Sequence, residues 1–187
     1  MSLLINSSYA QSSDSVNFKN YTSNDLKFRI EHSPKWKVEE DDTGVWFTIR
    51  ENEKEDVKVN EFFSMPAGSF DSFFRVSLEK PKSDLDTDTM TVQNTSLQER
   101  VQQELDMISS NPSEDTLIRH NEVTLAGNTG YKIEYRTTDE YKDRYVSVII
   151  TLADGKFYIL RYVDVPLKVP ETLPLVNKMV QSFQIMR

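Results

Sequence analysis

The sequence predicts an α+β fold in which helices pack on the faces of a central antiparallel sheet. Apolar and polar residues alternate in short runs separated by turns, first over residues 26–79 and again over residues 118–163. One segment with helical spacing of its apolar residues follows each of these two blocks. Because the order is strands, helix, strands, helix, it argues against a βαβ nucleotide-binding fold.

The first block begins with a run that places three apolar side chains on one face of a strand: Leu26, Phe28 and Ile30. Pro34 interrupts the run because proline has no N–H for a sheet ladder, and Trp36 and Val38 resume the alternation. We therefore expect two strand halves with a bend fixed by Pro34, and burial of Phe28, Ile30 and Trp36 beneath a helix. Further strands are predicted at residues 45–49, 57–65 and 72–79. Because the runs are short and adjacent, they predict an antiparallel meander.

A polar loop is predicted at residues 81–95, and a helix follows it at residues 96–110. Ser96 and Glu99 have the spacing of a capping box, in which each side chain binds a free backbone N–H at the helix start. The apolar residues that follow lie three or four positions apart, on one helix face: Leu97, Val101, Leu105 and Ile108. We expect the helix to end near Ser110, because Asn111 precedes a proline.

The second block contains four predicted strands, at residues 118–125, 131–136, 144–152 and 156–163. The glycines of residues 126–130 predict a tight turn, and Asp154-Gly155 predicts a hairpin. A last helix is predicted over residues 171–185, with Pro174 in its first turn. Its buried side is expected to consist of Leu175, Val176, Met179, Val180 and Phe183.

The length of 187 residues fits one domain, which we place at residues 18–187. Residues 1–17 are interpreted as a disordered tail or a signal-peptide remnant. Ser8-Tyr9-Ala10 before Gln11 resembles the end of a secretory signal, so we expect an exported, extracellular or cell-surface protein. Three triplets fit glycosylation acceptors, at Asn6, Asn20 and Asn94. No run approaches the ~20 apolar residues of a membrane span.

Composition excludes several classes of function. The net charge of −8 is a poor match to nucleic acid or anionic lipid, since both are bound through Lys and Arg. The chain has no cysteine, which excludes disulfides, thiol catalysis and thiolate metal sites. Acidic residues outnumber basic ones over residues 37–61, and we interpret this run as a solvated hairpin, with a cation-attracting edge as the alternative.

Four segments together resemble the PsbP-like family, relatives of the extrinsic PsbP subunit of the photosynthetic oxygen-evolving complex. They are YTSNDLKFRIEHSPKWKV, GNTGYKIEY, DGKFYILRYV and MVQSFQI. The resemblance covers residues 18–186. At the start, where the family shows F-x-[IV]-x-[YH]-P-x-x-W, this chain has His32-Ser33-Pro34 in place of the usual Tyr-Pro.

The resemblance implies an α/β/α sandwich around an antiparallel sheet. Family members include plant lumenal proteins, cyanobacterial lipoproteins and exported archaeal proteins without an assigned role. This chain lacks the lipobox cysteine, so it does not resemble the lipid-anchored kind. Its N-terminal segment is neutral to acidic, which argues against stabilisation of a manganese cluster through a basic extension and favours a non-photosynthetic member.

The candidate metal ligands fall in two groups. His32 and His120 could ligate a metal with a carboxylate if their strands were neighbours, although two ordinary strand or turn histidines are the interpretation we favour. The second group resembles the opening of a calcium loop: Asp84, Asp86 and Asp88. Thr89 then stands where the turn glycine belongs and Thr95 where the bidentate Glu belongs. We therefore favour a solvated acidic loop, with weak divalent binding as the alternative.

No catalytic residue and no cofactor are predicted. The sequence contains no G-x-S-x-G, no H-E-x-x-H and no glycine-rich phosphate loop. Seven aromatic residues could line a ligand pocket, but alternate strand positions favour the core for them. They are Trp36, Trp46, Tyr131, Tyr135, Tyr145, Tyr158 and Tyr162.

Our leading hypothesis is a non-enzymatic, exported binding or assembly accessory that acts on a protein partner at the cell surface or membrane. The alternative is a protein that binds a small molecule or divalent metal in a pocket between the sheet and the helix at residues 96–110.

Overall fold

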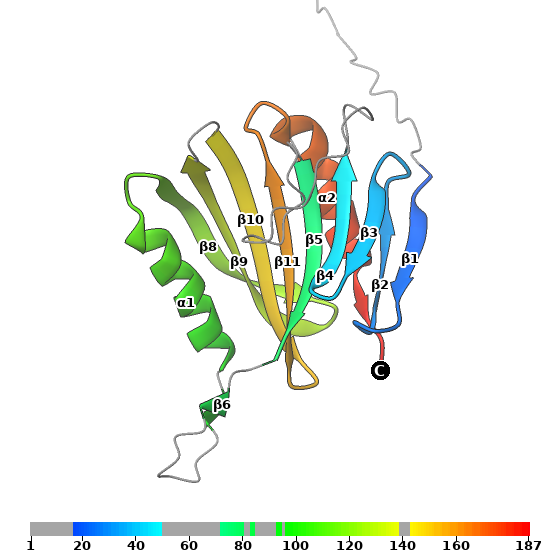
Figure 1. Ribbon diagram of the computed structural model, residues 1–187, viewed down its shortest axis with the longest axis horizontal. Helices are drawn as coiled ribbons and strands as arrows, with labels where there is room; N and C mark the ends of the chain where they lie inside the picture. Colours follow the sequence, from blue (N-terminus) through cyan, green and yellow to red (C-terminus); the bar gives the residue numbers. More distant parts are fainter. Residues whose placement is uncertain (1–16, 50–71, 81–82, 85–92, 95, 139–142) are drawn as a thin grey trace, which may run out of the picture.

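The computed structural model describes residues 17–49, 72–80, 83–84, 93–94, 96–138 and 143–187. Its elements follow the predicted order of strands, helix, strands and helix (Figure 1). Before the first helix lie β1 (Lys19–Ser23), β2 (Phe28–His32), β3 (Lys37–Asp41), β4 (Gly44–Ile49), β5 (Ser72–Glu79), β6 (Ser83–Asp84) and β7 (Gln93–Asn94). There follow α1 (Leu97–Ser110), β8 (Asp115–Leu125), β9 (Asn128–Thr138), β10 (Asp143–Ala153), β11 (Lys156–Asp164), α2 (Val169–Ser182) and β12 (Gln184–Ile185).

Antiparallel pairing dominates the fold, as predicted. Within the described residues, the main sheet has seven strands in the order β3-β4-β5-β11-β10-β9-β8, and a second sheet has the order β1-β2-β12. β6 and β7 form a separate two-stranded ladder. Each of these pairings is antiparallel. The α+β class with an antiparallel sheet is therefore confirmed.

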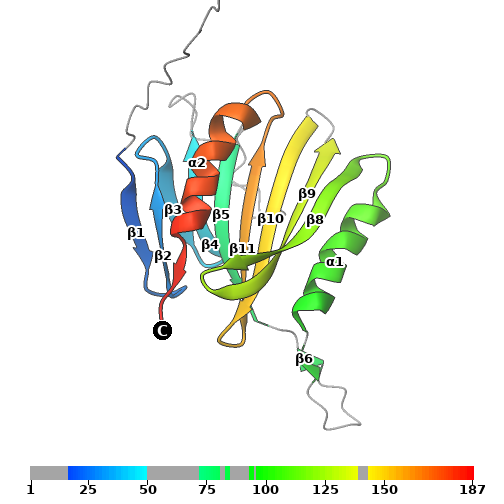
Figure 2. The ribbon, with the colours of Figure 1, turned by 180° about the vertical axis from the view of Figure 1, so that it is seen from behind.

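Alternate residues of β10 and β11 pack into two different cores. The α2-side core joins Val176 and Met179 of α2 to residues such as Ile149 and Leu160. The α1-side core joins Leu97, Val101 and Ile108 of α1 to residues such as Val148 and Ile159. Figure 2 shows α2 alongside the three-stranded sheet and α1 at the other end of the molecule. Because successive strand residues point to opposite faces, both faces of the main sheet carry apolar side chains.

The α1 helix begins as the sequence predicts. Ser96 is its N-cap, and the capping box is complete because Ser96 and Glu99 bind each other's backbone N–H. The expected apolar stripe is buried at Leu97, Val101 and Ile108. Leu105 is only half-buried. The residue that is buried between Val101 and Ile108 is Glu104. A charged residue therefore lies on the face that the pattern assigns to apolar packing.

The last helix differs from its prediction at both ends. α2 begins at Val169, so Pro170 occupies the first turn and Pro174 lies inside the helix. It ends at Ser182, where the backbone of Phe183 becomes extended and residues 184–185 pair with β2 as β12. The prediction of a helix to residue 185 is wrong. The buried side is confirmed at Val176, Met179 and Phe183, while Leu175 and Val180 are half-buried.

The run around Pro34 forms two strands, one on either side of the proline as predicted, but they are not halves of one strand in a single sheet. β2 belongs to the three-stranded sheet and β3 to the main sheet, so the chain changes sheets at residues 33–36. The N–H of Trp36 binds the carbonyl of Ser33 at 3.0 Å, which closes the turn. Phe28, Ile30 and Trp36 are buried in the α2-side core, as predicted. The predicted strand at residues 57–65 and the tail at residues 1–16 lie outside the described residues.

Candidate functional site

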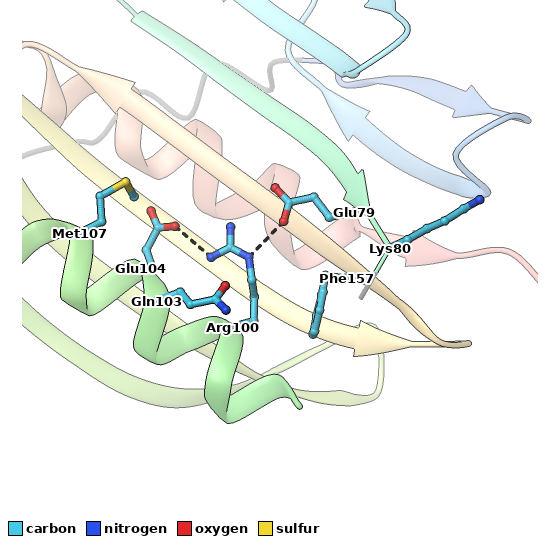
Figure 3. A pocket seen from close by; sticks show the side chains of 7 residues that line it. All are labelled: Glu79, Lys80, Arg100, Gln103, Glu104, Met107 and Phe157. Atoms are coloured by element: carbon cyan, nitrogen blue, oxygen red, sulfur yellow. Dashed lines mark hydrogen bonds and ion pairs between the residues drawn. The ribbon is translucent and has the colours of Figure 1, made fainter. Parts of the chain in front are cut away.

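A cleft of about 530 Å³ lies beside α1, between this helix and the ends of β5 and β11. Its position matches the pocket that the sequence suggested as an alternative, between the sheet and the first helix. Figure 3 shows the lining side chains: Glu79, Lys80, Arg100, Gln103, Glu104, Met107 and Phe157. Arg100, Gln103 and Met107 lie along one flank of α1. Each is three or four residues, about one helical turn, after the one before it. The cleft therefore has one helical wall and one sheet wall.

A chain of ionic contacts crosses the cleft. The Nε of Arg100 donates to Glu79 Oε2 at 3.0 Å, and its Nη1 donates to Glu104 Oε2 at 3.3 Å (Figure 3). The other oxygen of Glu104 accepts from Arg161 Nη2 at 2.7 Å, and Arg161 Nη1 contacts the hydroxyl of Tyr135 at 3.3 Å. Both carboxylate oxygens of Glu104 are thus occupied. This network links α1 to β5, β9 and β11.

The burial of Glu104 depends on these partners. Its side chain is only 1% exposed, and an unpaired carboxylate at that depth would be strongly destabilising. Burial alone would lower the pKa of the Arg100 guanidinium. Contacts with Glu79 and Glu104 outweigh burial and raise this pKa above its ordinary value. Sequence reasoning placed a pocket beside this helix but missed the ionic network that crosses it. The available signal was the i, i+4 spacing of Arg100 and Glu104 on the predicted apolar stripe.

The cleft combines charged side chains with two apolar ones. Phe157 borders the cleft but is buried in the α1-side core, while Met107 is 49% exposed. Glu79 is 47% exposed and uses one of its two oxygens on Arg100. Both oxygens of Glu104 are occupied by guanidinium groups, so neither is free to bind a ligand. The exposed side chains of Met107 and Glu79 can contact a ligand directly.

A second buried glutamate, Glu134 on β9, faces away from this cleft. It accepts from Arg119 and Tyr145, and from Lys132 at 3.1 Å. Burial alone would raise the pKa of Glu134, but these donors outweigh it and lower the pKa from 4.5 to about 2. Burial and the contact with Glu134 raise the pKa of Tyr145 well above its ordinary value. We interpret this cluster as a structural one, because each partner binds the same carboxylate.

The two predicted histidine ligands are not brought together. His32 ends β2 in the three-stranded sheet and is buried, whereas His120 is exposed on β8 of the main sheet. The Nδ1 of His32 lies 3.0 Å from the carbonyl of Ser33, and its ring centroid is 5.4 Å from that of Phe47. Burial lowers the pKa of His32.

The predicted acidic loop is described only at its first residue. Asp84 lies in β6, where it pairs with Gln93, and Asp86 and Asp88 lie outside the described residues. Within the described ranges, no group of three or more His, Asp or Glu side chains is arranged to hold a metal ion. The metal site at these residues stays a prediction.

The acidic hairpin uses its carboxylates on neighbouring strands. Glu40 accepts from the hydroxyls of Tyr21 and Ser23 on β1. Asp41 accepts from Gly44 N at 2.9 Å and from Trp46 Nε1 at 2.8 Å. Burial would raise the pKa of Asp41, but such hydrogen bonds lower it. The described acidic residues therefore include two that fasten β1 and β4 to β3; residues 50–61 are not described.

Most of the predicted aromatic set lies in the two cores. Trp36, Tyr158 and Tyr162 are buried in the α2-side core and Tyr135 in the α1-side core. Tyr145 and Tyr131 pack against these cores as half-buried residues. Trp46 is buried below the Arg75 guanidinium, which lies 4.4 Å from its ring centroid. The aromatic side chains are thus mainly core residues, as favoured from the sequence.

No helix within the described ranges is both long and apolar enough to cross a membrane. Comparison with protein families gives a match to the PsbP family over residues 16–185. Among curated protein sequences, none matches this chain.

Solved structures share the fold at low sequence identity. Cyanobacterial PsbP (CyanoP) from Synechocystis sp. PCC 6803 has a TM-score of 0.56 and 14% identity, over 91% of this chain and 93% of that one. LpqN of Mycobacterium tuberculosis, described as involved in cell envelope biogenesis, has a TM-score of 0.55 and 11% identity, over 91% of each chain. PA94 of Pseudomonas aeruginosa, a protein of unknown function, has a TM-score of 0.53 and 13% identity, over 88% of this chain and 94% of that one.

Proposed function

The chain belongs to the PsbP family, and we propose that it is a non-enzymatic, exported accessory that binds a protein partner at the cell surface or membrane. The observation that carries this proposal is the open cleft beside α1. Its buried carboxylate is fully paired with Arg100 and Arg161, while the exposed Met107 offers apolar contact area. Such a site is suited to holding a partner and lacks a free proton donor or acceptor at its centre.

The fold comparisons support export of this chain, because LpqN, which shares the fold, is involved in cell envelope biogenesis. For this chain we propose an extracellular or cell-surface location, with residues 1–17 as a tail or signal remnant before one domain at residues 18–187. We further propose that the fold is an α/β/α sandwich, which is supported by the division of β10 and β11 side chains between an α1-side and an α2-side core.

Photo-crosslinking in the native cell tests the accessory function. A photoreactive residue at position 107 lies in the cleft, and one at Leu167, which is 95% exposed before α2, serves as the matched control. We expect an adduct in the envelope or membrane fraction that forms from position 107 and not from position 167. The same adducts from both positions, or none from position 107, would contradict the proposal.

A small molecule or divalent cation in the same cleft is the second candidate. The volume of about 530 Å³ favours it, because small-molecule pockets fall in the range of roughly 300–1,000 Å³. Calorimetry with Ca²⁺, Zn²⁺ and Mn²⁺ tests the metal version, and heat that is lost in Glu79→Gln would place the ion in the cleft. A titration without heat at millimolar ion excludes it.

A further inference from the structure

We infer that the cleft beside α1 binds an extended peptide segment of the partner. One apolar side chain of that segment lies against the exposed side chain of Met107. A backbone amide group of the segment lies against the polar rim formed by Glu79, Arg100 and Gln103. This inference rests on the function proposed above and commits the cleft to one class of occupant.

The polar rim offers hydrogen-bond donors and acceptors side by side. Arg100 uses Nε and Nη1 on the two glutamates, and its Nη2 has no hydrogen-bond partner among the described residues. Glu79 accepts through Oε2, and its Oε1 has no hydrogen-bond partner among the described residues. The Gln103 amide, which carries both a donor and an acceptor, lies beside Arg100 in Figure 3. A peptide group presents one N–H and one C=O, so it is complementary to this rim.

The charges around the cleft select against a strongly charged ligand. Arg100 lies between the carboxylates of Glu79 and Glu104, and Arg161 neutralises Glu104 from the other side. Lys80 extends away from Arg100 (Figure 3). A carboxylate would enter beside two glutamates and an ammonium group beside two arginines. A neutral amide meets neither repulsion.

Met107 provides the anchor for an apolar side chain. It is unbranched and 49% exposed, and a thioether side chain adapts to ligands of different shape. Phe157 lies at the opposite end of the cleft and is only 1% exposed, so it closes that end as part of the α1-side core. An aliphatic side chain against Met107 would bury apolar area that is now open to water.

Titration followed by NMR tests the ligand class. The probe is N-acetyl-leucine N-methylamide, and the comparison probes are acetate, methylammonium and N-methylacetamide, with the Met107 methyl and Gln103 side-chain amide signals as readouts. We expect saturable shifts with the leucine amide, at least about tenfold tighter than with any comparison probe. No saturation with the leucine amide, or equal binding of acetate or methylammonium, overturns the inference.

Two neighbouring glutamines of α1 allow the contribution of the polar rim to be measured apart from that of the rest of the helix. Gln103→Leu keeps the size of the side chain and removes the amide in the cleft. Gln102→Leu is the matched control, because Gln102 bonds to Asp106 on the exposed face of α1. We expect about tenfold weaker binding of the leucine amide to Gln103→Leu and unchanged binding to Gln102→Leu. Equal affinities for the two variants would overturn the assignment.

The two proposals fail in different ways. An adduct from position 107 in cells, with no binding of the leucine amide, would keep the accessory function and overturn the peptide inference. Binding of the leucine amide without any position-specific adduct would overturn the accessory function and keep only the selectivity of the cleft for a neutral amide.

Discussion

Two glutamates are buried against the main sheet, and each is held by different donors. Glu134 lies among Arg119, Lys132 and Tyr145, which keep its carboxylate ionised far into the acid range. Glu104 lies between Arg100 and Arg161, one from its own helix and one from β11. The carboxylate of Glu134 links strands of the main sheet to one another, whereas that of Glu104 links α1 to the main sheet.

Glu134 is expected to make stability depend on pH in the acid range. Its pKa is about 2 in the folded state and 4.5 ordinarily, so the folded state releases the proton more readily than the unfolded chain. The stabilisation is complete above about pH 4.5 and is lost as the pH falls toward 2, amounting to about 2–3 kcal/mol. Denaturant unfolding of the wild type and Glu134→Gln from pH 7 to pH 2 checks this. A Gln variant with an unchanged slope below pH 4.5 would contradict it.

Removing the charge of Glu104 is expected to cost about 3 kcal/mol of unfolding free energy, because Arg161 and Arg100 lose a buried partner. Urea unfolding of Glu104→Gln measures this loss. Glu114→Gln, at an exposed position in the loop before β8, is the control and should change stability by less than about 0.5 kcal/mol. A similar small change in both variants would show that the ionic network does not hold α1.

At the scale of elements, the start of α1 depends on its cap. Ser96→Ala removes the hydroxyl that accepts the N–H of Glu99, so we expect a loss of about 1 kcal/mol. Ser109→Ala is the control inside the same helix, and it should be neutral or slightly stabilising because alanine favours helix. Thermal unfolding of the two variants compares them directly. A loss that is the same in both would rule out the capping contribution.

The β4–β5 pairing requires a residue without a side chain at position 44. A Cβ on Gly44 would lie 2.6 Å from the carbonyl oxygen of Val76 and 3.1 Å from Arg75 Nε. Gly44→Ala must therefore push β4 and β5 apart, and we expect it to destabilise the protein by about 1–3 kcal/mol. Gly127→Asn is the control, since its positive φ has open space and asparagine tolerates it. Chemical unfolding checks both, and an equal effect would contradict the packing argument.

Elements with strong patterns were predictable from the sequence. The alternation in 131–136 and 156–163 and the capping box before α1 each use residue types that fit only one local structure. The sequence KNYTS of β1 has no apolar alternation, so the pattern does not predict a strand there. It forms a strand because it pairs with β2 and because two of its hydroxyl groups donate to Glu40. The sequence predicts helix at residues 184–185 because these residues suit either state, and pairing with β2 makes them a strand.

The candidate site was predictable only in its position. The first helix and the sheet were expected, and a cleft does lie between them. Glu104 and Arg161 are 57 residues apart, so local spacing gives no sign of their contact. The histidine pair illustrates the same limit: His32 and His120 belong to strands of different sheets, which only the topology reveals. The metal site stays a prediction.

At the scale of the whole molecule, the two sheets share one core. Phe28 and Ile30 of β2 pack in the same cluster as Phe47 and Phe74 of the main sheet, with Met179 of α2 fully buried among them. The three-stranded sheet is therefore not an independent unit. The shared core predicts that both sheets unfold together.

Met179→Ala tests the shared core. We expect a loss of about 2–5 kcal/mol, with amide hydrogen exchange speeding up together in β2 and in β10 and β11. Asn177→Ala, at an exposed position of the same helix, should leave exchange in both sheets unchanged. Faster exchange confined to β1 and β2 would show that the small sheet opens separately.

β2 is the central strand of its sheet, with β1 on one side and β12 on the other. Arg29 is thus bound to Gln184, a residue 155 positions later. During synthesis, β2 emerges early and must wait for nearly the whole domain before its second neighbour exists. Closing so large a loop is slow, and meanwhile an unpaired strand edge is open to wrong partners. The moment at which a growing chain becomes resistant to protease is therefore expected to be set by the arrival of residues 184–185.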